Sequence, residues 1–368
     1  MAHQTFYRKY RSQTFDEVVG QTHIIQTLRN AITYDRLSHA YIFSGPRGTG
    51  KTSTARILAK VLNCKNREDL KPCLTCEICS NIAKGVAVDI IEIDAASNTG
   101  VDHIRELNDK VRFMPVECEY KFYIIDEAHM LSTGAFNALL KTMEEPPGNT
   151  IFILATTEPH KIPVTIHSRC QHLNFRKLTT SELSSQLRMI AESEKIEIEE
   201  KSLTTIARNA SGCMRDAISL LDQIYSFKGE SITYDDVLTI LGATNIAQLY
   251  DLVALFFENN SRETMQKVSA ICEEGGNVVQ LIKDLTAVFK QVLYFKMNLT
   301  DYIEADETGL AQIKTLADKV EMGRLKNYIE GFANMEMELR WFSNPELLIQ
   351  SKFLLFMADD QKIGRAHV

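Results

Sequence analysis

An eight-residue segment near the N-terminus has the residue types and the spacing of a phosphate-binding loop. Residues 45–52 read Gly-Pro-Arg-Gly-Thr-Gly-Lys-Thr and satisfy the pattern G-x-x-x-x-G-K-[ST] in full. The apolar run 40–43 precedes the segment and a helix-like stretch, 53–62, follows it, as the motif requires. A chance glycine-rich turn is the alternative, and these flanking elements argue against it. The sequence therefore predicts a nucleotide site.

The parts of this loop have distinct chemical roles. Glycines allow successive backbone N–H groups to point at phosphate oxygens, and the positive end of the following helix dipole strengthens the attraction. Lys51 is expected to reach the β- and γ-phosphates, and the hydroxyl of Thr52 is expected to bind Mg²⁺. The residues of this segment predicted to contact the nucleotide are Gly45, Pro46, Arg47, Gly48, Thr49, Gly50, Lys51, Thr52 and Ser53.

Two carboxylates follow a second apolar run, residues 121–125. Asp126 stands where a strand would end and is predicted to hold Mg²⁺, while Glu127 is predicted to orient and deprotonate the attacking water. A charged pair that merely caps a strand is the alternative, and the phosphate-binding loop earlier in the same chain disfavours it. The expected activity is therefore nucleotide hydrolysis and not binding alone.

An aromatic and cationic segment precedes the loop. Tyr7, Val18 and Val19 are predicted to pack around an adenine ring, with Arg11 nearby. The alternative is an N-terminal arm that only covers the core. The residue pattern supports both interpretations.

Polar residues also follow two other strand-like runs. Residues 151–157 end in a pair of hydroxyls, where a polar side chain is placed to sense the γ-phosphate. Residues 88–93 lead into segment 97–100 at the start of a predicted helix, which is a favourable position for a phosphate contact. An ordinary helix cap has the same residue types, so this second segment is a weaker indication.

Four cysteines form a cluster directly after the helix that follows the loop. Cys64, Cys73, Cys76 and Cys79 have spacings of x8, x2 and x2, and four thiolates at such spacings can close on one tetrahedral ion. An all-cysteine site leaves no vacant ligand position, so the predicted role is structural. Zinc is the preferred ion; an iron–sulfur cluster and unliganded buried thiols are the alternatives. The scattered cysteines, predicted to be small core residues, are Cys118, Cys170, Cys213 and Cys272.

Composition and charge narrow the class of protein. The chain has 368 residues, 45% of them hydrophobic and 24% charged, and no apolar run approaches the ~20 residues of a membrane helix. Its start lacks the apolar core of a signal peptide, so a cytoplasmic location is expected. The net charge of −7 argues against a non-specific nucleic-acid binder. Residues 1–62 nevertheless carry nine Lys or Arg against three Asp or Glu, whereas residues 243–360 carry eleven against eighteen. Contacts with nucleotide and DNA are therefore expected in the N-terminal part of the chain, and contacts with protein in the C-terminal part.

The order of elements predicts an α/β domain followed by all-α domains. Strand-like and helix-like runs alternate over 37–176, which implies a parallel sheet covered on both faces. From Lys177 the pattern indicates only helices, beginning with a capping box, Thr179-x-x-Glu182. The predicted divisions are 1–177 with a metal module at 64–79, a helical domain at 178–242, and a second helical domain at 243–360. Residues 363–368 match one reading frame of a sequencing adapter and are set aside as a suspected non-native tail.

Taken together, these motifs resemble those of the gamma/tau subunits of bacterial DNA polymerase III, the AAA+ ATPase motors of the sliding-clamp loader. The resemblance extends over residues 4–358, and the four-cysteine insertion separates this family from other AAA+ proteins. The motifs that carry it are GPRGTGKT, EIDAASNTGVD, IIDEAHMLS, NALLKTMEEPP, ATTEPHKIPVTIHSRC and GCMRDAISLLDQ.

The resemblance implies roles for residues that spacing alone does not assign. The fold would be an AAA+ P-loop domain with a zinc insertion, a helical lid and a C-terminal helical collar. Thr157 would be the first sensor of the γ-phosphate, and Arg215 a second sensor reaching down from the lid. Arg169 would be an arginine finger that enters the ATP site of the adjacent subunit. Arg105 and Lys141 would meet the phosphates of primed DNA.

The resemblance also implies the function. The chain would use ATP, Mg²⁺ and Zn²⁺ to open the ring-shaped clamp and place it on primer–template DNA, within a holoenzyme whose polymerase site lies elsewhere. Its partners would be delta, delta prime, further gamma/tau copies, the clamp and DNA, with no membrane. One alternative is a non-hydrolysing scaffold subunit like delta prime, against which Lys51, Thr52, Asp126 and Glu127 argue. Another is a DEAH-like helicase, which would need a second RecA-like domain in the region predicted to be helical.

Overall fold

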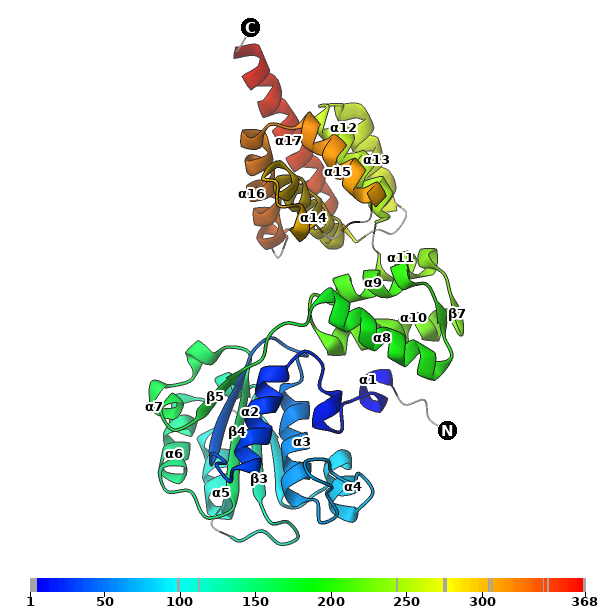
Figure 1. Cartoon of the computed structure of the whole chain (residues 1–368). Helices are drawn as coiled ribbons and strands as arrows, with labels where there is room; N and C mark the ends of the chain where they lie inside the picture. Colours follow the sequence, from blue (N-terminus) through cyan, green and yellow to red (C-terminus); the bar gives the residue numbers. More distant parts are fainter. Residues whose placement is uncertain are drawn as a thin grey trace. The chain divides into compact units, whose positions relative to one another are not determined.

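The computed structural model describes residues 5–97, 100–111, 113–242, 244–273, 277–303, 305, 307–339, 341–342 and 344–366 (Figure 1). The chain divides into two compact units, residues 1–233 and 234–368. The first is built on a parallel sheet, and the described part of the second consists of helices.

Five parallel strands form the sheet of the first unit in the order β2-β3-β4-β1-β5. Their register places Ser44 beside Thr156 and Asn174, and Asp94 beside Asp126. Because parallel strands end at the same edge, the polar residues that follow them meet there. The strand bounds are β1 Ala40–Ser44, β2 Ile90–Asp94, β3 Lys121–Asp126, β4 Thr150–Thr156 and β5 Gln171–Asn174.

Helices cover both faces of this sheet, as predicted. Alternate residues of one strand enter different cores: Tyr41 and Phe43 pack with α2 and α3, whereas Ile42 packs with α5 and α6. Burial on both faces explains why the central strands are almost wholly apolar. The elements are α1 Phe6–Lys9, η1 Phe15–Glu17, α2 Thr22–Thr33, α3 Lys51–Asn63, α4 Glu77–Lys84, α5 Val101–Val111, η2 Ala128–Met130, α6 Thr133–Glu144, η3 Pro159–Lys161 and α7 Val164–His167.

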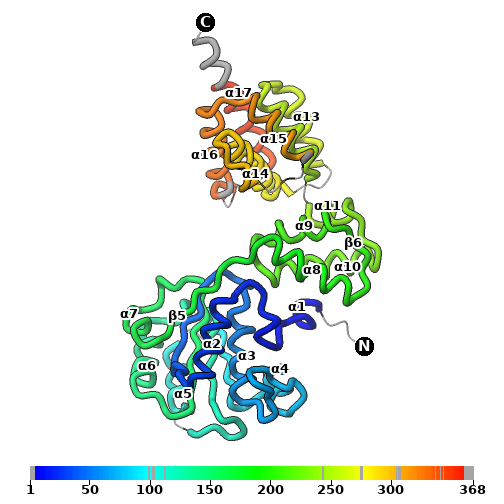
Figure 2. The backbone as a smooth tube through the Cα atoms, viewed as in Figure 1, coloured from blue at the N-terminus to red at the C-terminus, as the bar shows by residue number. Residues whose placement is uncertain are grey.

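Three helices, α8, α9 and α10, complete the first unit and lie side by side (Figure 2). The predicted capping box is present: the Thr179 hydroxyl accepts from the Glu182 N–H, and the Glu182 carboxylate accepts from the Thr179 N–H. The bounds are α8 Thr180–Glu194, α9 Glu200–Asn209 and α10 Met214–Lys228.

The prediction that only helices follow Lys177 is wrong in one detail. Strands β6, Glu197–Ile198, and β7, Ser231–Ile232, pair in parallel beside these helices. Each strand has two residues, which is too short to produce a visible alternation of apolar and polar positions. Their pairing depends on the packing of α8 and α10, which brings the two segments together.

The second unit encloses one large apolar core. The apolar stripe of α14 is buried there, including Leu285, Phe289 and Val292. Over the described residues, no single helix is both long and apolar enough to cross a membrane; α11 and α12 meet those criteria only together, across a 62° bend. The final helix runs through to Ala366 and so includes part of the suspected tail. The bounds are α11 Tyr234–Leu241, α12 Ile246–Phe257, α13 Ser261–Glu273, α14 Val278–Lys296, η4 Thr300–Tyr302, α15 Glu307–Lys319, α16 Met322–Glu338 and α17 Pro345–Ala366.

Asp284 of α14 makes the stability of this unit dependent on pH. Burial raises its pKa to about 6, although the Gln280 side-chain amide donates to it at 2.8 Å. The unfolded state releases this proton near the ordinary pKa of Asp, so stability is expected to fall as pH rises from about 4 to about 6. We expect Asp284→Asn to stabilise the unit by about 2 kcal/mol at pH 8, with the gain shrinking toward pH 4. Hydrogen exchange of the α14 amides measures this, and a gain that is the same at both pH values would contradict it.

Candidate nucleotide site

The loop between β1 and α3 adopts a conformation that requires glycine. Gly45, Gly48 and Gly50 have φ values of 137°, 69° and 100°. A Cβ on Gly45 would lie 2.2 Å from the Phe175 carbonyl oxygen, and a Cβ on Gly48 would lie 2.1 Å from the Cys213 sulfur. The backbone is thus curled tightly at the point where α3 begins, as a phosphate-binding loop requires.

Lys51 is held inside this curl. Its side chain donates to the carbonyl oxygens of Gly45 at 2.9 Å and Pro46 at 2.8 Å, and the residue is only 6% exposed. Burial lowers the pKa of Lys51, while the nearby Glu127 and Asp126 carboxylates oppose that shift. The two carbonyl oxygens accept hydrogen bonds from the Lys51 ammonium group. They hold it within the loop, where the motif predicts contact with phosphate oxygens.

A hydroxyl and a carboxylate meet at the edge of the sheet next to the loop. The Thr52 hydroxyl donates to the Asp126 carboxylate at 2.8 Å, and the other Asp126 oxygen accepts from the Glu127 N–H at 3.0 Å. Oxygen ligands of this kind are what Mg²⁺ prefers. The two residues predicted to hold the ion from separate parts of the sequence are therefore in contact.

The predicted base and the predicted first sensor are neighbours. Thr157 follows β4, and its hydroxyl lies 3.4 Å from a Glu127 carboxylate oxygen. Glu127 itself has φ 48°, a left-handed conformation that L-residues seldom adopt. This turn places the carboxylate beyond the end of β3, on the side of the loop.

A cavity of about 750 Å³ lies over the loop and is rich in cationic side chains. The predicted residues that line it are Tyr7, Arg11, Val18, Val19, Arg47, Gly48, Thr49, Gly50, Lys51, Thr52, Ser53, Asp126, Glu127 and Arg215. Arg56, Lys60, Lys84 and Glu92 also line it and were not predicted; Arg56 and Lys60 lie one and two turns along α3 from Thr52. The cavity is therefore suited to a large polyanion with an apolar end near Val18 and Val19.

Two predicted arginines occupy defined positions in this cavity. Arg11 donates to the Ser53 hydroxyl at 3.0 Å, and burial lowers its pKa to about 10, so it remains cationic at neutral pH. The Arg215 guanidinium lies 5.1 Å from the centre of the Tyr7 ring. Arg215 stands at the start of α10, so the helical part of the first unit contributes directly to the cavity.

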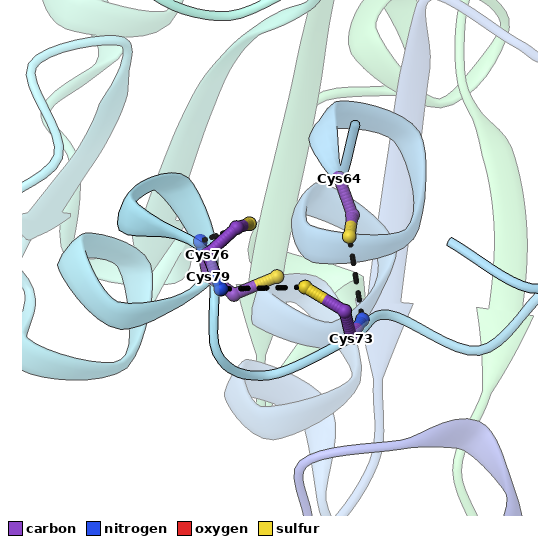
Figure 3. Close-up of side chains that lie close together, drawn as sticks. All are labelled: Cys64, Cys73, Cys76 and Cys79. Atoms are coloured by element: carbon purple, nitrogen blue, oxygen red, sulfur yellow. Dashed lines mark hydrogen bonds between the residues drawn. The ribbon is translucent and has the colours of Figure 1, made fainter. Parts of the chain in front are cut away.

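The four clustered cysteines converge (Figure 3). The sulfur atoms of Cys64, Cys73, Cys76 and Cys79 all lie within 4.8 Å of one another. The N–H groups of Cys73, Cys76 and Cys79 donate to the sulfurs of Cys64, Cys73 and Cys76 at 3.3, 3.3 and 3.5 Å. Backbone donation by Cys76 and Thr75 lowers the pKa of Cys73 to about 6. This is a compact set of four sulfur ligands on which one metal ion can be bound.

Comparison with known proteins matches successive parts of the chain to DNA polymerase III families. The matching family models are the DNA polymerase III delta subunit over 20–179, the clamp loader subunit ATPase lid domain over 182–229, and domain III of subunits gamma and tau over 232–345. DNA polymerase III subunit tau of Bacillus subtilis is 43% identical over 355 residues, 95% of this chain and 62% of that protein. The chain belongs to the gamma/tau family of clamp-loader subunits.

Other gamma/tau relatives give the same result. Subunit tau of Salmonella typhimurium is 37% identical over 97% of this chain and 56% of its own length, and gamma/tau of Mycobacterium bovis is 37% identical over 96% and 63%. The chain thus spans about three-fifths of these relatives. Among solved structures, RuvB of Thermotoga maritima has a TM-score of 0.48 at 19% identity, over 68% of this chain and 80% of that one.

Six residues predicted to contact nucleotide or DNA do not line the cavity. Gly45 and Pro46 accept from Lys51 and Thr157 lies beside Glu127, whereas the other three, Arg169, Arg105 and Lys141, lie elsewhere. Arg169 forms an ion pair with Glu144 at 2.6 Å and donates to the Thr165 carbonyl oxygen at 2.7 Å. Arg105 on α5 and Lys141 on α6 are exposed, and these two helices pack together. Within segment 97–100, Asn98 and Thr99 lie outside the described residues, and the Ser97 hydroxyl donates to Asp94 at 3.0 Å.

Several residues around the site were not found from the sequence. Gln21 donates to the Thr49 carbonyl oxygen at 3.4 Å and to that of Arg176 at 2.8 Å, which ties α2 to the loop. Cys213, predicted as a core residue, is buried but also packs against Gly48, and the next N–H, from Met214, donates to the Gly48 carbonyl oxygen at 3.0 Å. Only the position of Cys213 two residues before Arg215 could have indicated this contact.

Proposed function

We propose that this chain is the ATP-hydrolysing motor subunit of a bacterial sliding-clamp loader. The observation that carries the proposal is the convergence of Lys51, Thr52, Asp126 and Glu127 at one cavity. A subunit that served only as a scaffold would not need a buried lysine, a pair of magnesium ligands and a base around one cavity. The arrangement therefore favours a hydrolysing subunit over one like delta prime.

In this proposal each residue has a task in phosphoryl transfer. The backbone N–H groups of the loop and Lys51 hold the β- and γ-phosphates, while Thr52 and Asp126 supply oxygen ligands for Mg²⁺. The ion neutralises charge on the phosphate oxygens when it is bound. Glu127 accepts a proton from the attacking water, and Thr157 and Arg215 contact the γ-phosphate region. Tyr7, Arg11, Val18 and Val19 hold the base and sugar end.

Hydrolysis is proposed to occur at the interface between adjacent subunits. Arg169 lies outside its own cavity, so we assign it to the ATP site of the neighbour, where a cation supplied in trans stabilises the transition state. ATP binding at such interfaces orders a spiral that opens the clamp and admits a primer–template junction. Loss of the γ-phosphate contacts then relaxes the spiral and releases the closed clamp on DNA.

The remaining assignments concern partners and domains. The lid comprises residues 178–242 and the collar residues 243–360, where this chain would join delta, delta prime and other gamma/tau copies. Arg105 and Lys141, both exposed, are proposed to meet the phosphates of primed DNA. The family's role in replication supports a cytoplasmic location. A DEAH-like helicase is disfavoured because the second unit has no strand over its described residues.

We also propose that the four cysteines hold one structural zinc ion. Sulfurs bound to tetrahedral zinc lie roughly 3.8 Å apart, given Zn–S bonds of about 2.3 Å. The four sulfurs here all lie within 4.8 Å of one another, so small side-chain adjustments would close them on one ion. Elemental analysis of purified protein is expected to give one zinc per chain, and Cys73→Ser is expected to lower the zinc content by at least tenfold. Cys272→Ser, in the second unit, is the matched control and should retain the zinc. Iron with acid-labile sulfide, or less than one zinc in the unaltered chain, would contradict the assignment.

The test of the proposed function is ATP hydrolysis in the reconstituted loader. The chain is mixed with delta and delta prime, and turnover is measured with and without clamp and primed DNA. We expect strong stimulation by both, and no ATP binding or turnover with Lys51→Ala. A chain that hydrolyses ATP at full rate alone, indifferent to partners and DNA, would overturn the proposal.

A further inference from the structure

A histidine bridges two carboxylates beside the site. His129 lies in η2, two residues after Glu127, and its side chain is only 8% exposed. Its Nδ1 atom lies 3.2 Å from the Thr156 hydroxyl oxygen and 3.5 Å from a Glu127 carboxylate oxygen. Its Nε2 atom lies 3.3 Å from a Glu158 carboxylate oxygen. Both nitrogens of one buried ring are thus occupied by groups at the ends of β3 and β4.

Glu158, the carboxylate next to His129 Nε2, has several other partners. The Glu158 N–H donates to the Thr156 hydroxyl at 3.0 Å, and the Glu158 carboxylate accepts from Lys161 at 3.0 Å and lies 3.6 Å from His160. Lys161 lowers the pKa of Glu158, with His129 and His160 contributing, so this carboxylate stays ionised. A carboxylate 3.3 Å from one ring nitrogen helps to set the orientation of the whole imidazole.

At its other end, His129 lies next to the Glu127 carboxylate, whose orientation matters for hydrolysis. The same Glu127 oxygen lies near both the Thr157 hydroxyl and His129 Nδ1. The backbone of Glu127 is in the left-handed region, so the surrounding contacts must hold this residue in place. A base has to lie within hydrogen-bonding reach of the water that it deprotonates, and a misplacement of about 1 Å can cost roughly 100-fold in rate.

We propose that His129 is a positioning residue for Glu127, with Glu158 as its anchor. This inference rests on the proposed hydrolysis, in which Glu127 is the base. Over the described residues, His129 does not itself line the cavity and reaches it only through Glu127. It acts by fixing the carboxylate of Glu127 relative to Thr157.

The anchor also belongs to the segment that carries Arg169. Glu158 directly precedes η3, whose Pro159 carbonyl oxygen lies 3.0 Å from His167 Nε2 at the end of α7. Arg169 follows two residues later, and its N–H donates to the Ile166 carbonyl oxygen at 3.0 Å. His129 therefore ties the base of one site to the segment that, in the proposed ring, reaches the neighbouring site.

The test compares His129 with His160, which also lies near Glu158 but is not paired with Glu127. In the reconstituted loader, with saturating clamp and primed DNA, His129→Ala is expected to lower kcat about 10- to 100-fold. The Kd for ATP should change by less than about twofold, because the residue does not line the cavity. The matched control is His160→Ala, which removes a histidine near Glu158 but leaves Glu127 untouched; its kcat should stay within about twofold. His129→Asn retains a polar group close to the Nδ1 position and should recover part of the lost rate.

A double-mutant cycle separates positioning from a general structural role. If His129 acts through Glu127, His129→Ala should have no further effect on the residual turnover of Glu127→Gln. Three results would overturn the inference. The first is a normal kcat in His129→Ala, and the second is a loss of kcat that multiplies fully with that of Glu127→Gln. The third is a loss of kcat matched by weaker ATP binding. The unaltered chain in the same assay tests the underlying function separately. If it does not hydrolyse ATP under any condition, the proposed function fails; if it does and His129→Ala matches it, only the positioning role fails.

Discussion

Glu127→Gln is expected to leave ATP bound to the reconstituted loader and to stop its turnover. The amide keeps the size of the side chain but cannot accept the proton of the attacking water, and a general base contributes about 10²- to 10⁴-fold to rate. Nucleotide affinity should stay within about twofold, because the proposed phosphate contacts come from the loop and Lys51, which this change leaves intact. Single-turnover hydrolysis and equilibrium binding of a fluorescent ATP analogue give the two quantities.

The matched control for this prediction is Glu119→Gln, the same chemical change at an exposed position away from the cavity. It should leave both affinity and turnover unchanged. Asp126→Asn should differ from both, because loss of a proposed magnesium ligand should make turnover depend on higher Mg²⁺ concentrations. If Glu127→Gln hydrolysed ATP at the normal rate, Glu127 would not be the base.

The parts of the site that the sequence predicts are those in which the chemistry is local. The loop 45–52 and the pair Asp126 and Glu127 each lie in one short stretch, and each follows an apolar strand. A strand that ends at a polar residue fixes where that residue emerges, so the motif and the flanking pattern were enough. The fold of the first unit followed from the same alternation of strands and helices.

The contacts that the sequence did not predict depend on register and packing. His129 meets Glu158 only because β3 and β4 are neighbours in the sheet, with Ile125 beside Leu154. Cys213 meets Gly48 because α10 packs against the loop, and no local pattern encodes that approach. The paired strands β6 and β7 were missed for a different reason: each has two residues, which carry too little periodicity to indicate a strand.

Arg169→Ala is expected to lower hydrolysis in the assembled loader by about 10³-fold while leaving the affinity for ATP unchanged. The reason is geometric: Arg169 does not line the cavity of its own subunit, so its removal should not disturb binding there. Its guanidinium instead pairs with Glu144, a half-exposed contact that a neighbouring phosphate can replace. Steady-state hydrolysis by the loader, with ATP binding measured in parallel, gives both values.

Two further variants determine whether this loss belongs to an arginine finger. Arg169→Lys keeps the charge but not the planar pair of donors, so it should recover only a small part of the rate. Arg188→Ala is the matched control, because Arg188 is also half-exposed and pairs with a glutamate, Glu200, on the lid; its turnover should be normal. The decisive comparison mixes subunits: an Arg169→Ala subunit should fail to stimulate its neighbour's site yet hydrolyse ATP when a normal subunit supplies the missing cation. A loss of the same size in the isolated chain would show that Arg169 acts within its own subunit, and unchanged hydrolysis in the loader would remove it from the reaction.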